Sequence, residues 1–588
     1  MKLNELIELY DQRTTKKFDE QDFRSELEKL IGKEGEESDF FLKAEYLAFD
    51  FVEIDNAASS SWGTYFGPKL VWKLDDGSIL ECPSINSIND GILNYWELRA
   101  RTSINPILIA RYSGLIWDFK KKITGKTPHF QYCELIIIAS VDIANGDFHK
   151  HDYFTINKLK RAFELSKRLN DFKLINLVKD TILSYEVSHR NDEKPGLWGY
   201  SYDLLIDQKN KFLSNDEEDK IIIDLESKIT RLLADETNNN QVNPWAIEAA
   251  AKRLAKYYRR KERIIDVKRV LGVVGNAFER IMNEAMPLQI AGWLEHLYNL
   301  FNDYGLKEEA MDILKRIRGQ GPIAAESLRV ETTKMEIPQD QLDVVISFIN
   351  TGDLNTSINK IANFFIPSLQ MVDEKIENLS QLHPLFFLIG HKLQDEKGRI
   401  IASVGPLEKD LDGHRALQIS RDLKYSAIFL RKILEGLIND KGLNRDSIID
   451  FISTTPIIEE SRYEIISRGL DAYFQGDYLV FIHLLIPQIE EGIRNLVEKS
   501  GGQVLRPSPD KEGFNLKTLH NLLDSEILKE VLGQDCSDYL KILFTDQRGW
   551  NLRNSVCHGL ASIETFNCNV ADRILQTLLI LGLIALKE

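Results

Sequence analysis

Apolar residues recur at every third or fourth position along most of the chain, which is the spacing of one face of a helix. Charged and polar residues fill the positions between them and form short turns between the periodic stretches. The clearest of these patterns predict helices over 157–169, 172–186, 246–259, 263–282, 288–304 and 307–318. We therefore expect a mainly α protein.

The region 131–320 is predicted to consist of such helices joined by short turns. Its segments 288–304 and 307–318 look like one helical hairpin of a tetratricopeptide-type array. The period is too irregular to count repeats. An α-solenoid and a non-repeating helical domain are therefore both open for this region.

Two stretches within this helical pattern are typical of β-hairpins. The first pairs 69–74 with 78–82 across the turn Asp75-Asp76-Gly77. The second pairs 384–389 with 399–404 across a turn at 395–398. We therefore expect a mixed α/β domain at 1–130 and a mixed helical domain with a hairpin at 321–454.

The C-terminal region, 455–588, is predicted to form a bundle of four or five helices. Pro487 lies inside one helical pattern, which predicts a kink or a late start. The final apolar run, 575–586, is too short to span a membrane, so a buried closing helix is expected. The predicted segments are 459–475, 478–499, 516–523, 525–532, 539–544 and 570–586.

Length, charge and cysteine content narrow the class of protein. A chain of 588 residues is too long for one hydrophobic core. The formal net charge is -16 at pH 7, so any nucleic-acid binding must rest on a local basic site. The five cysteines include no CxxC pair, which favours a reducing cytosol. The N-terminal segment lacks the apolar core of a signal peptide, so we expect a cytoplasmic protein without membrane association.

The candidate chemistry lies in a short stretch near the C-terminus, 549–559. It places Arg553, Asn554 and His558 within six residues, between apolar helices. A permanent cation, a polar orienting group and a side chain that titrates near neutral pH are what in-line attack on a phosphodiester requires. Asn551 is a suitable helix N-cap, which places Arg553 in the first turn, where phosphate is attracted.

The spacing of these side chains limits which of them can face one phosphorus atom from a single helix. Asn554 and His558 are four residues apart and share a face. Arg553 and His558 are five apart, which is about 140° around an ideal helix. Both can reach one phosphorus atom if the helix ends near Gly559, or if a second copy of the bundle faces the first. The second arrangement predicts a homodimer through the C-terminal bundle, with a composite cleft.

The segment Arg553-Asn554-Ser-Val-Cys-His558-Gly559 resembles the motif of HEPN (higher eukaryote and prokaryote nucleotide-binding) ribonuclease domains, an arginine and a downstream histidine with a polar residue after the arginine. It also looks like the RNxxxHG signature of a little-characterised, mostly bacterial family in that group, where the motif lies near the C-terminus. The likeness covers about 455–588, including Glu490 and Arg494, and fades upstream.

This resemblance implies a metal-independent endoribonuclease that acts as a dimer, in anti-phage defence or as a toxin with a regulatory or antitoxin protein. It implies that His558 is the general base or acid at the 2′-hydroxyl or the leaving oxygen. Arg553 would stabilise charge on the phosphorane, and Asn554 would orient His558 or the phosphate. The products would carry 2′,3′-cyclic phosphate and 5′-hydroxyl ends, and no cofactor or metal would be needed.

Three further residues are candidates for binding RNA beside the motif. Arg548 supplies positive charge, Trp550 can stack on a base, and Glu490 can brace the site from the second helix of the bundle. Each also has a structural interpretation, as surface charge, core packing or a solvated helix face. Arg553 also has a structural interpretation, as a salt bridge to Glu490 or Glu491, and His558 can be satisfied by carbonyls at a helix end.

Other kinds of site have weaker signals. Cys557 beside His558 suggests a thiol nucleophile, but adjacent side chains point about 100° apart on a helix. His149, His151 and Asp152 have metal-binding side chains, but solvated loop histidines are the simpler interpretation. The sequence contains no glycine-rich phosphate loop. The competing classes are a non-catalytic helical scaffold that binds nucleotide or a protein, and a regulatory subunit of a separate enzyme.

Overall fold

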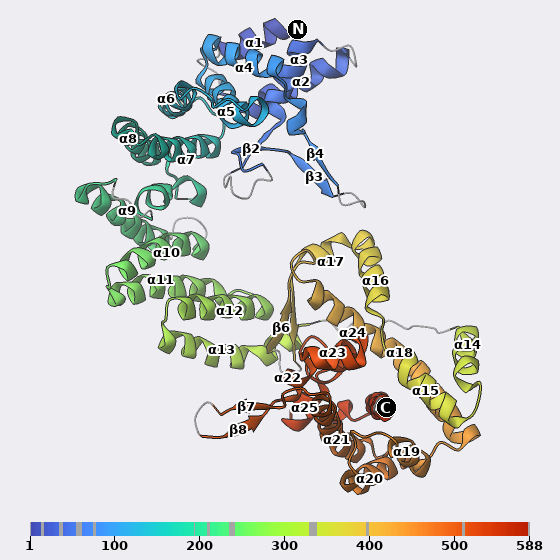
Figure 1. The fold of residues 1–588 in the computed structure, drawn as a ribbon. Coiled ribbons are helices and arrows are strands. Elements are labelled where there is room, and N and C mark those ends of the chain that lie inside the picture. The colour runs from blue at the N-terminus through green and yellow to red at the C-terminus, as the bar shows by residue number, and fades with distance from the viewer. Residues whose placement is uncertain are drawn as a thin grey trace. The chain divides into compact units, whose positions relative to one another are not determined.

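The computed structural model describes residues 2–12, 17–34, 39–54, 62–73, 78–192, 194–207, 212–234, 242–328, 338–395, 399–508 and 512–585. The protein is 72% helical, and the strands among these residues form four two-stranded antiparallel sheets (Figure 1). The predicted mainly α class is therefore confirmed. The chain divides into two compact units, 1–313 and 314–588.

The first unit begins with five helices and two small sheets. The predicted hairpin at 69–82 is confirmed, because Leu70 pairs with Cys82 and Lys73 with Ile79 in antiparallel register. Its turn lies outside the described residues. The elements are α1 (Leu3–Asp11), α2 (Glu20–Glu34), α3 (Phe40–Asp50), β1 (Val52–Glu53), β2 (Phe66–Gly67), β3 (Leu70–Lys73), β4 (Ile79–Cys82), α4 (Asp90–Thr102) and α5 (Pro106–Thr124).

Local sequence signals fix both ends of α5, a helix that lines a cavity of the first unit. Asn105 caps its start by accepting a hydrogen bond from the N–H of Ile107, and Pro106 occupies the first helical position. Gly125 ends it with a φ of 72°, a left-handed conformation that glycine adopts without strain. Between these ends, most of the helix is buried.

The rest of the first unit is a succession of helices, most of which pack against the next one in the chain (Figure 1). The helices predicted over 157–318 are confirmed, although several begin or end a few residues away from the predicted bounds. A π-helical turn covers Tyr202–Ile206. The helices are α6 (Gln131–Gly146), α7 (Asp152–Leu169), α8 (Phe172–His189), α9 (Asn215–Ala234), α10 (Pro244–Arg260), α11 (Ile264–Met282), α12 (Pro287–Asp303) and α13 (Lys307–Glu326), the last of which crosses into the second unit.

The second unit adds further helices and two hairpins among its described residues. They are α14 (Gln339–Asn350), α15 (Leu354–Phe364), α16 (Leu369–Leu382), α17 (Pro384–Leu388), β5 (His391–Gln394), β6 (Ile400–Val404), α18 (Leu411–Lys441), α19 (Arg445–Ile452), α20 (Tyr463–Phe474), α21 (Tyr478–Lys499), β7 (Leu505–Pro507), β8 (Phe514–Leu516), α22 (Leu519–Leu523), α23 (Glu526–Leu532), α24 (Gln534–Phe544), α25 (Leu552–Cys557) and α26 (Cys568–Gly582).

The core of the second unit is organised around α26. Every residue from Val570 to Gly582 is buried, so the predicted buried closing helix is confirmed. The helix packs against α15, α18, α19 and α21. It buries the Arg573 side chain completely, with hydrogen bonds to Gln576 (2.9 Å), to the Ser426 hydroxyl (2.6 Å) and to the Leu423 carbonyl (3.1 Å). These bonds tie α26 to α18 in the middle of the core.

Several predicted bounds in the second unit are wrong. Residues 384–388 form α17 instead of a strand, and the strand that pairs with β6 is His391–Gln394. Pro384 occupies the first position of α17, where proline is pre-organised for a helix. The helix predicted at 516–523 begins only at Leu519, after β8, and that at 539–544 begins at Gln534.

The helix that contains Pro487 begins where its apolar pattern begins. It runs from Tyr478 to Lys499 with the proline inside, so the alternative of a late start is wrong. Asp477 caps its first turn by accepting a hydrogen bond from the N–H of Val480 at 3.1 Å.

No helix in the described part of the chain combines the length and the apolar character needed to cross a bilayer.

Candidate active site

The backbone before α25 is fixed by one close approach. The Ile542 carbonyl, near the end of α24, accepts a hydrogen bond from the N–H of Trp550 at 2.9 Å. A Cβ atom on Gly549 would lie 2.3 Å from that same oxygen, so only glycine fits there. Asn551 follows with a φ of 50°, in the left-handed region that asparagine tolerates better than most residues. The chain then turns directly into α25.

The short helix α25 buries one side and presents the other. Leu552 and Val556, four residues apart, are 3% and 5% exposed. They anchor the helix against α21 and α24. Arg553 and Asn554 are half-buried, and His558 just beyond the last turn is exposed. The proposed catalytic side chains therefore lie at the surface of the second unit.

Arg553 is held by a carboxylate from the neighbouring helix α21. Its Nε lies 2.9 Å from Oε2 of Glu490, whose other oxygen lies 3.1 Å from a guanidinium nitrogen of Arg494. Arg494 also pairs with Glu491. The side chains of Glu490, Arg494 and Arg553 are 14%, 12% and 23% exposed, so this carboxylate bridges two partly desolvated arginines.

Asn554 contacts the turn that precedes its helix. The expected helix start at Asn551 is confirmed, but the Asn551 side chain does not cap a backbone N–H. Its Oδ1 instead accepts a hydrogen bond from Nδ2 of Asn554 at 2.7 Å, and the Thr545 carbonyl lies 3.5 Å from the same nitrogen. Within one protomer, the amide nitrogen of Asn554 therefore faces this turn.

His558 lies where α25 ends. Its N–H donates to the Asn554 carbonyl at 3.2 Å, and Gly559 then adopts a φ of 65° and leads the chain away. Among the described residues, nothing forms a hydrogen bond or an ion pair with the imidazole. Because the helix ends at Cys557, the angle expected for an ideal helix does not fix the direction of the His558 side chain. The residue is exposed to solvent.

Cys557 does not have the electrostatic setting of a nucleophile. Burial raises the pKa of its thiol, and Arg553 lowers that pKa to a smaller extent. The thiol therefore stays protonated near neutral pH, whereas a nucleophilic cysteine needs its thiolate.

The residues expected to bind RNA beside the motif are engaged in other contacts. Arg548 pairs with Asp546 through two hydrogen bonds of 3.0 and 2.7 Å. The indole N–H of Trp550 lies 3.3 Å from the Ser420 carbonyl on α18, and its ring packs against the core of the second unit. Glu490 forms the carboxylate bridge already described.

A cavity of about 330 Å³ adjoins the start of the motif. Gly549, Trp550 and Leu552 line it, together with residues of α18 and of the segment before α26. Arg553, Asn554 and His558 are not among its lining residues. These three side chains therefore lie at the surface of the second unit, outside this cavity.

The histidines considered as metal ligands are held apart by different partners. His149 is buried, with Nδ1 at 2.9 Å from the Thr155 hydroxyl, and His151 pairs with Asp19. A different group, Asp147, Asp152 and His189, has ligand atoms within 4.8 Å of one another. Asp147 in that group already pairs with Lys17, and Asp152 accepts a hydrogen bond from Tyr185 at 3.0 Å. One oxygen of each of these two carboxylates is therefore engaged, whereas Oδ1 of Asp147 is buried without a hydrogen-bond partner among the described residues.

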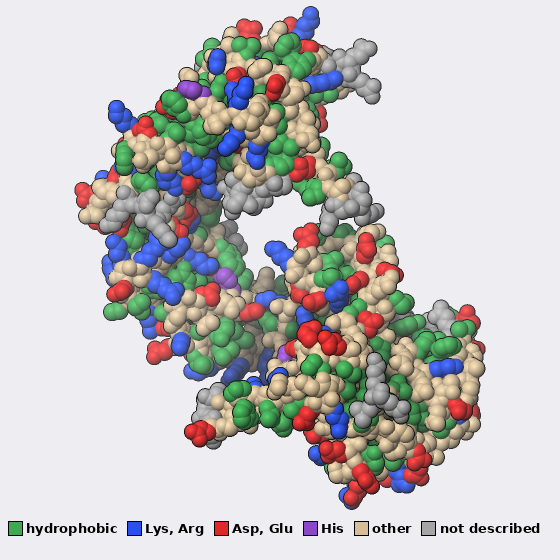
Figure 2. Space-filling view, in the orientation of Figure 1, with side chains coloured by type: hydrophobic (Ala, Val, Ile, Leu, Met, Phe, Trp, Pro, Cys, Tyr) green, Lys and Arg blue, Asp and Glu red, His purple; other side chains and the backbone are tan. Residues whose placement is uncertain are grey.

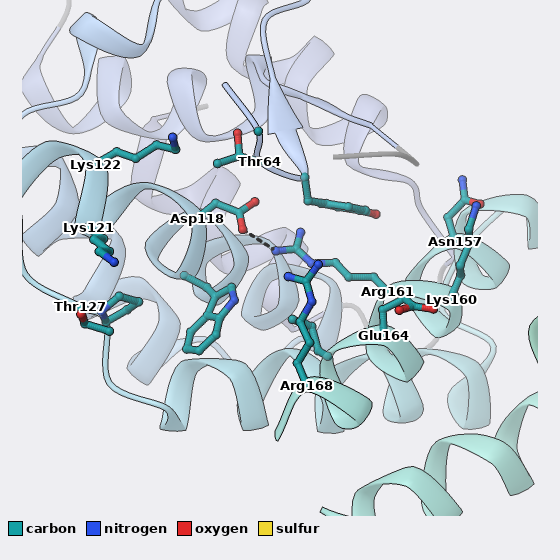
Figure 3. Close-up of a pocket in the computed structure, with 15 residues that line it drawn as sticks. Thr64, Asp118, Lys121, Lys122, Thr127, Asn157, Lys160, Arg161, Glu164 and Arg168 are labelled. Carbon is teal, nitrogen blue, oxygen red and sulfur yellow. Dashed lines mark hydrogen bonds and ion pairs between the residues drawn. The ribbon is translucent and has the colours of Figure 1, made fainter. Parts of the chain in front are cut away.

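A larger cavity, of about 900 Å³, lies in the first unit and was not predicted from the sequence (Figure 3). Basic side chains from α5 and α7 line it. The signals that could have revealed it are the pair Lys121-Lys122 and the spacing of Arg161 and Arg168, two turns apart on α7.

No family model, no curated protein and no solved structure matches this chain.

Proposed function

We propose that the second unit is a metal-independent endoribonuclease in which Arg553, Asn554 and His558 form the active site. One observation carries this proposal. The motif is presented at the surface on a short anchored helix, with the His558 imidazole exposed and the Arg553 guanidinium oriented by a carboxylate. Phosphodiester cleavage uses an accessible imidazole and an oriented cation, and this short segment supplies both.

In the proposed reaction, one neutral imidazole removes the proton from the 2′-hydroxyl. The 2′ oxygen attacks the adjacent phosphorus, and the bond from phosphorus to the 5′ oxygen breaks. A second, protonated imidazole gives its proton to that 5′ oxygen. The products are a 2′,3′-cyclic phosphate and a 5′-hydroxyl, and Arg553 stabilises the additional negative charge on the phosphorane.

A homodimer supplies the second imidazole. Two copies of the second unit that face each other would place both His558 rings and both Arg553 side chains around one phosphate. The open surface of the motif supports this arrangement, because a single protomer leaves its catalytic side chains outside the adjoining cavity. We also propose that residues 455–588 form a HEPN-like bundle. The helices of 131–320 would pack in a tetratricopeptide-like array.

The cellular role rests on the resemblance of the motif alone. It is RNA cleavage in the cytoplasm during anti-phage defence, or as a toxin held by a regulatory or antitoxin protein. In a chain with a formal net charge of -16, an RNA contact would have to be local. Figure 2 shows basic and acidic side chains mingled over the visible described surface of each unit, without an extended area of one sign.

The test uses the full chain, total RNA and excess EDTA. The wild-type protein is expected to cleave, and His558→Ala is expected to lose about 100-fold or more in rate, the usual contribution of a general acid or base. The matched control is His520→Ala, an exposed histidine of the same unit outside the motif. If His558→Ala cleaves as fast as this control, the catalytic assignment is wrong.

The ion pair of Arg553 favours a second candidate, a non-catalytic helical scaffold that binds nucleotide or a protein. A guanidinium bonded to Glu490 can serve only to join α25 to α21. Expression in a host cell separates the two candidates. Ribonuclease activity predicts that the wild-type protein slows growth and that Arg553→Ala relieves this effect. A scaffold predicts equal growth with both proteins.

A further inference from the structure

The cavity of about 900 Å³ in the first unit is lined by three parts of the chain. They are the segment 63–65 before β2, the C-terminal end of α5 with the residues that follow it, and one face of α7. Figure 3 shows Lys121 and Lys122 on one side of the cavity, Asn157 and Lys160 on the other, and Arg161 and Arg168 between them. The size falls within the usual range for small-molecule sites.

The lining is rich in positive charge although the whole chain is acidic. Five of the lining side chains are cationic and two are acidic, in a protein with a formal net charge of -16. The cationic residues are Lys121, Lys122, Lys160, Arg161 and Arg168, and the acidic residues are Asp118 and Glu164. This local excess of cations is the setting in which an anionic ligand binds.

One of these cations is built into the wall. The Arg161 side chain is 7% exposed, and its guanidinium lies 3.3 Å from a carboxylate oxygen of Asp118. The same guanidinium lies 3.8 Å from the centre of the Tyr65 ring, and Asp118 also accepts a hydrogen bond from the N–H of Phe66 at 3.2 Å. These contacts join α7, α5 and the segment around β2, so Arg161 is held in the wall of the cavity.

Three other cations have no such role. In the described part of the chain, the side chains of Lys121, Lys122 and Arg168 form no hydrogen bond and no ion pair, and all three are exposed. The charge of Arg168 acts on Asp118, but that carboxylate also faces Arg161, so cations still outnumber carboxylates at the cavity and an anion would relieve their repulsion. Phosphate is suited to them because each of its oxygens accepts charge-assisted hydrogen bonds.

The same cavity offers an apolar surface. The half-buried Trp117 lines it, on the helix that carries the two lysines. An indole provides a face on which a nucleobase can stack. Thr64, Thr127 and Asn157 add groups that can donate or accept hydrogen bonds.

We propose that this cavity binds a nucleotide, with Lys121, Lys122 and Arg168 contacting its phosphates and Trp117 its base. A small ligand fits better than an RNA strand. The charge of a nucleotide stays within the cavity, whereas a strand would continue over the surface of an acidic protein, where the overall field opposes it. The site lies in the first unit, and the proposal does not depend on the proposed ribonuclease activity of the second.

Calorimetric titration of the full chain tests this proposal, with ATP, GTP, CTP and UTP as probes. Inorganic tripolyphosphate and a short single-stranded RNA are titrated in parallel. The variant Lys121→Glu with Lys122→Glu is compared with a matched control, Lys2→Glu with Lys173→Glu, which alters two exposed lysines of the same unit outside the cavity. Thermal melting curves establish that both variants are folded.

At least one nucleoside triphosphate is expected to bind saturably at one site per chain, with tripolyphosphate weaker. The cavity variant is expected to weaken binding by about tenfold or more, because two charge-assisted contacts are reversed, and the control variant to leave it unchanged. His558→Ala is expected to bind as the wild type does. The proposal is wrong if none of the four nucleotides binds at about 1 mM, a dissociation constant typical of weak ligands.

Three other results would also contradict it. The first is equal loss of binding in the cavity variant and the control, which would place the ligand elsewhere. The second is tripolyphosphate binding as tightly as the tightest nucleotide, which would show that Trp117 does not stack on the base. The third is binding of the RNA strand without binding of any nucleotide, which would make the occupant a nucleic acid.

Discussion

Glu490 is the residue through which the candidate site and the stability of the bundle are coupled. Its carboxylate accepts hydrogen bonds from Arg553 at 2.9 Å and from Arg494 at 3.1 Å. Glu490→Gln keeps one acceptor oxygen but removes the negative charge between the two guanidinium groups. One hydrogen bond is lost, and Glu491, which pairs with Arg494, is then the carboxylate left beside the two arginines.

The expected cost follows from these contacts. A hydrogen bond to a charged group contributes about 1.5–3 kcal/mol, and the partial exposure of the three side chains, 12% to 23%, places this one toward the lower end. We therefore expect Glu490→Gln to lower the free energy of unfolding of the second unit by about 2 kcal/mol. For a unit of this size, the midpoint of thermal unfolding falls by roughly 4–8 °C.

The assay is urea denaturation of Glu490→Gln, Arg553→Gln and the double variant. The coupling energy between the two positions is expected to be about 1–2 kcal/mol, because they are in direct contact. The matched control is the same set of variants at another ion pair of this unit, Glu464→Gln, Arg468→Gln and the double variant. Glu464 and Arg468 lie 2.6 Å apart, and their side chains are 76% and 73% exposed. Their coupling should stay below about 0.5 kcal/mol.

The same variants separate a catalytic arginine from a structural one. If Arg553 acts on RNA, Glu490→Gln lowers the cleavage rate by about tenfold even where the protein is fully folded, because the guanidinium loses its orientation. A coupling energy no larger than that of the exposed control pair would refute the bridging role of Glu490. Lost stability with an unchanged cleavage rate would show that the pair is structural only.

Three further predictions concern residues around the motif. Gly549→Ala is expected to lower the free energy of unfolding by about 2–3 kcal/mol, because its Cβ would meet the Ile542 carbonyl at 2.3 Å. The control is Gly319→Ala inside α13, whose Cβ would meet nothing within 4 Å. In the same urea titration, this control should raise the free energy of unfolding by up to about 1 kcal/mol. Burial acts to raise the pKa of the Asp546 carboxyl, but the hydrogen bonds and charge of Arg548 outweigh burial and lower that pKa. The carboxylate therefore stabilises the fold at any pH above its pKa in the unfolded chain, which is about 3.9. This stabilisation is lost as the pH falls through the lowered pKa of the folded protein. Asp546→Asn should therefore cost about 1–2 kcal/mol at neutral pH and progressively less below about pH 4, as urea titrations at several pH values would measure. Because burial raises the pKa of the Cys557 thiol, this thiol should react with iodoacetamide mainly at alkaline pH. Cys557→Ser should cleave RNA at the wild-type rate. A large loss of activity in this variant would support a thiol nucleophile instead.

Local sequence signals predict the helices of the second unit where both ends carry a cap or a turn. The helix at 478–499 is predicted to the residue, because Gly476 and Asp477 end the preceding helix and Ser500 and Gly501 end this one. The prediction for 384–389 is wrong because an apolar stretch of that length suits a strand as well as a short helix. The fold selects the helix, which buries Phe387 on the core.

The candidate residues could be selected from the sequence because they lie close together, within 549–559. Their setting could be foreseen only in part. Glu490 is 63 residues from Arg553, and a salt bridge between them was one interpretation of the sequence, which the structure contains. The structural role of Gly549 depends on the position of Ile542, which the fold alone supplies. The cavity in the first unit, whose residues lie between 63 and 168, is assembled only when α5 and α7 come together.

The chemistry of the cut ends separates the proposed ribonuclease from every other candidate function. A defined RNA is incubated with the full chain in excess EDTA, next to the same RNA carrying a single 2′-deoxy residue at the cleaved position, and the fragments are identified by mass. We predict a 2′,3′-cyclic phosphate and a 5′-hydroxyl, no cut at the 2′-deoxy position, and neither product with His558→Ala. Cleavage at the 2′-deoxy position, or the same fragments from His558→Ala, would contradict the proposed mechanism.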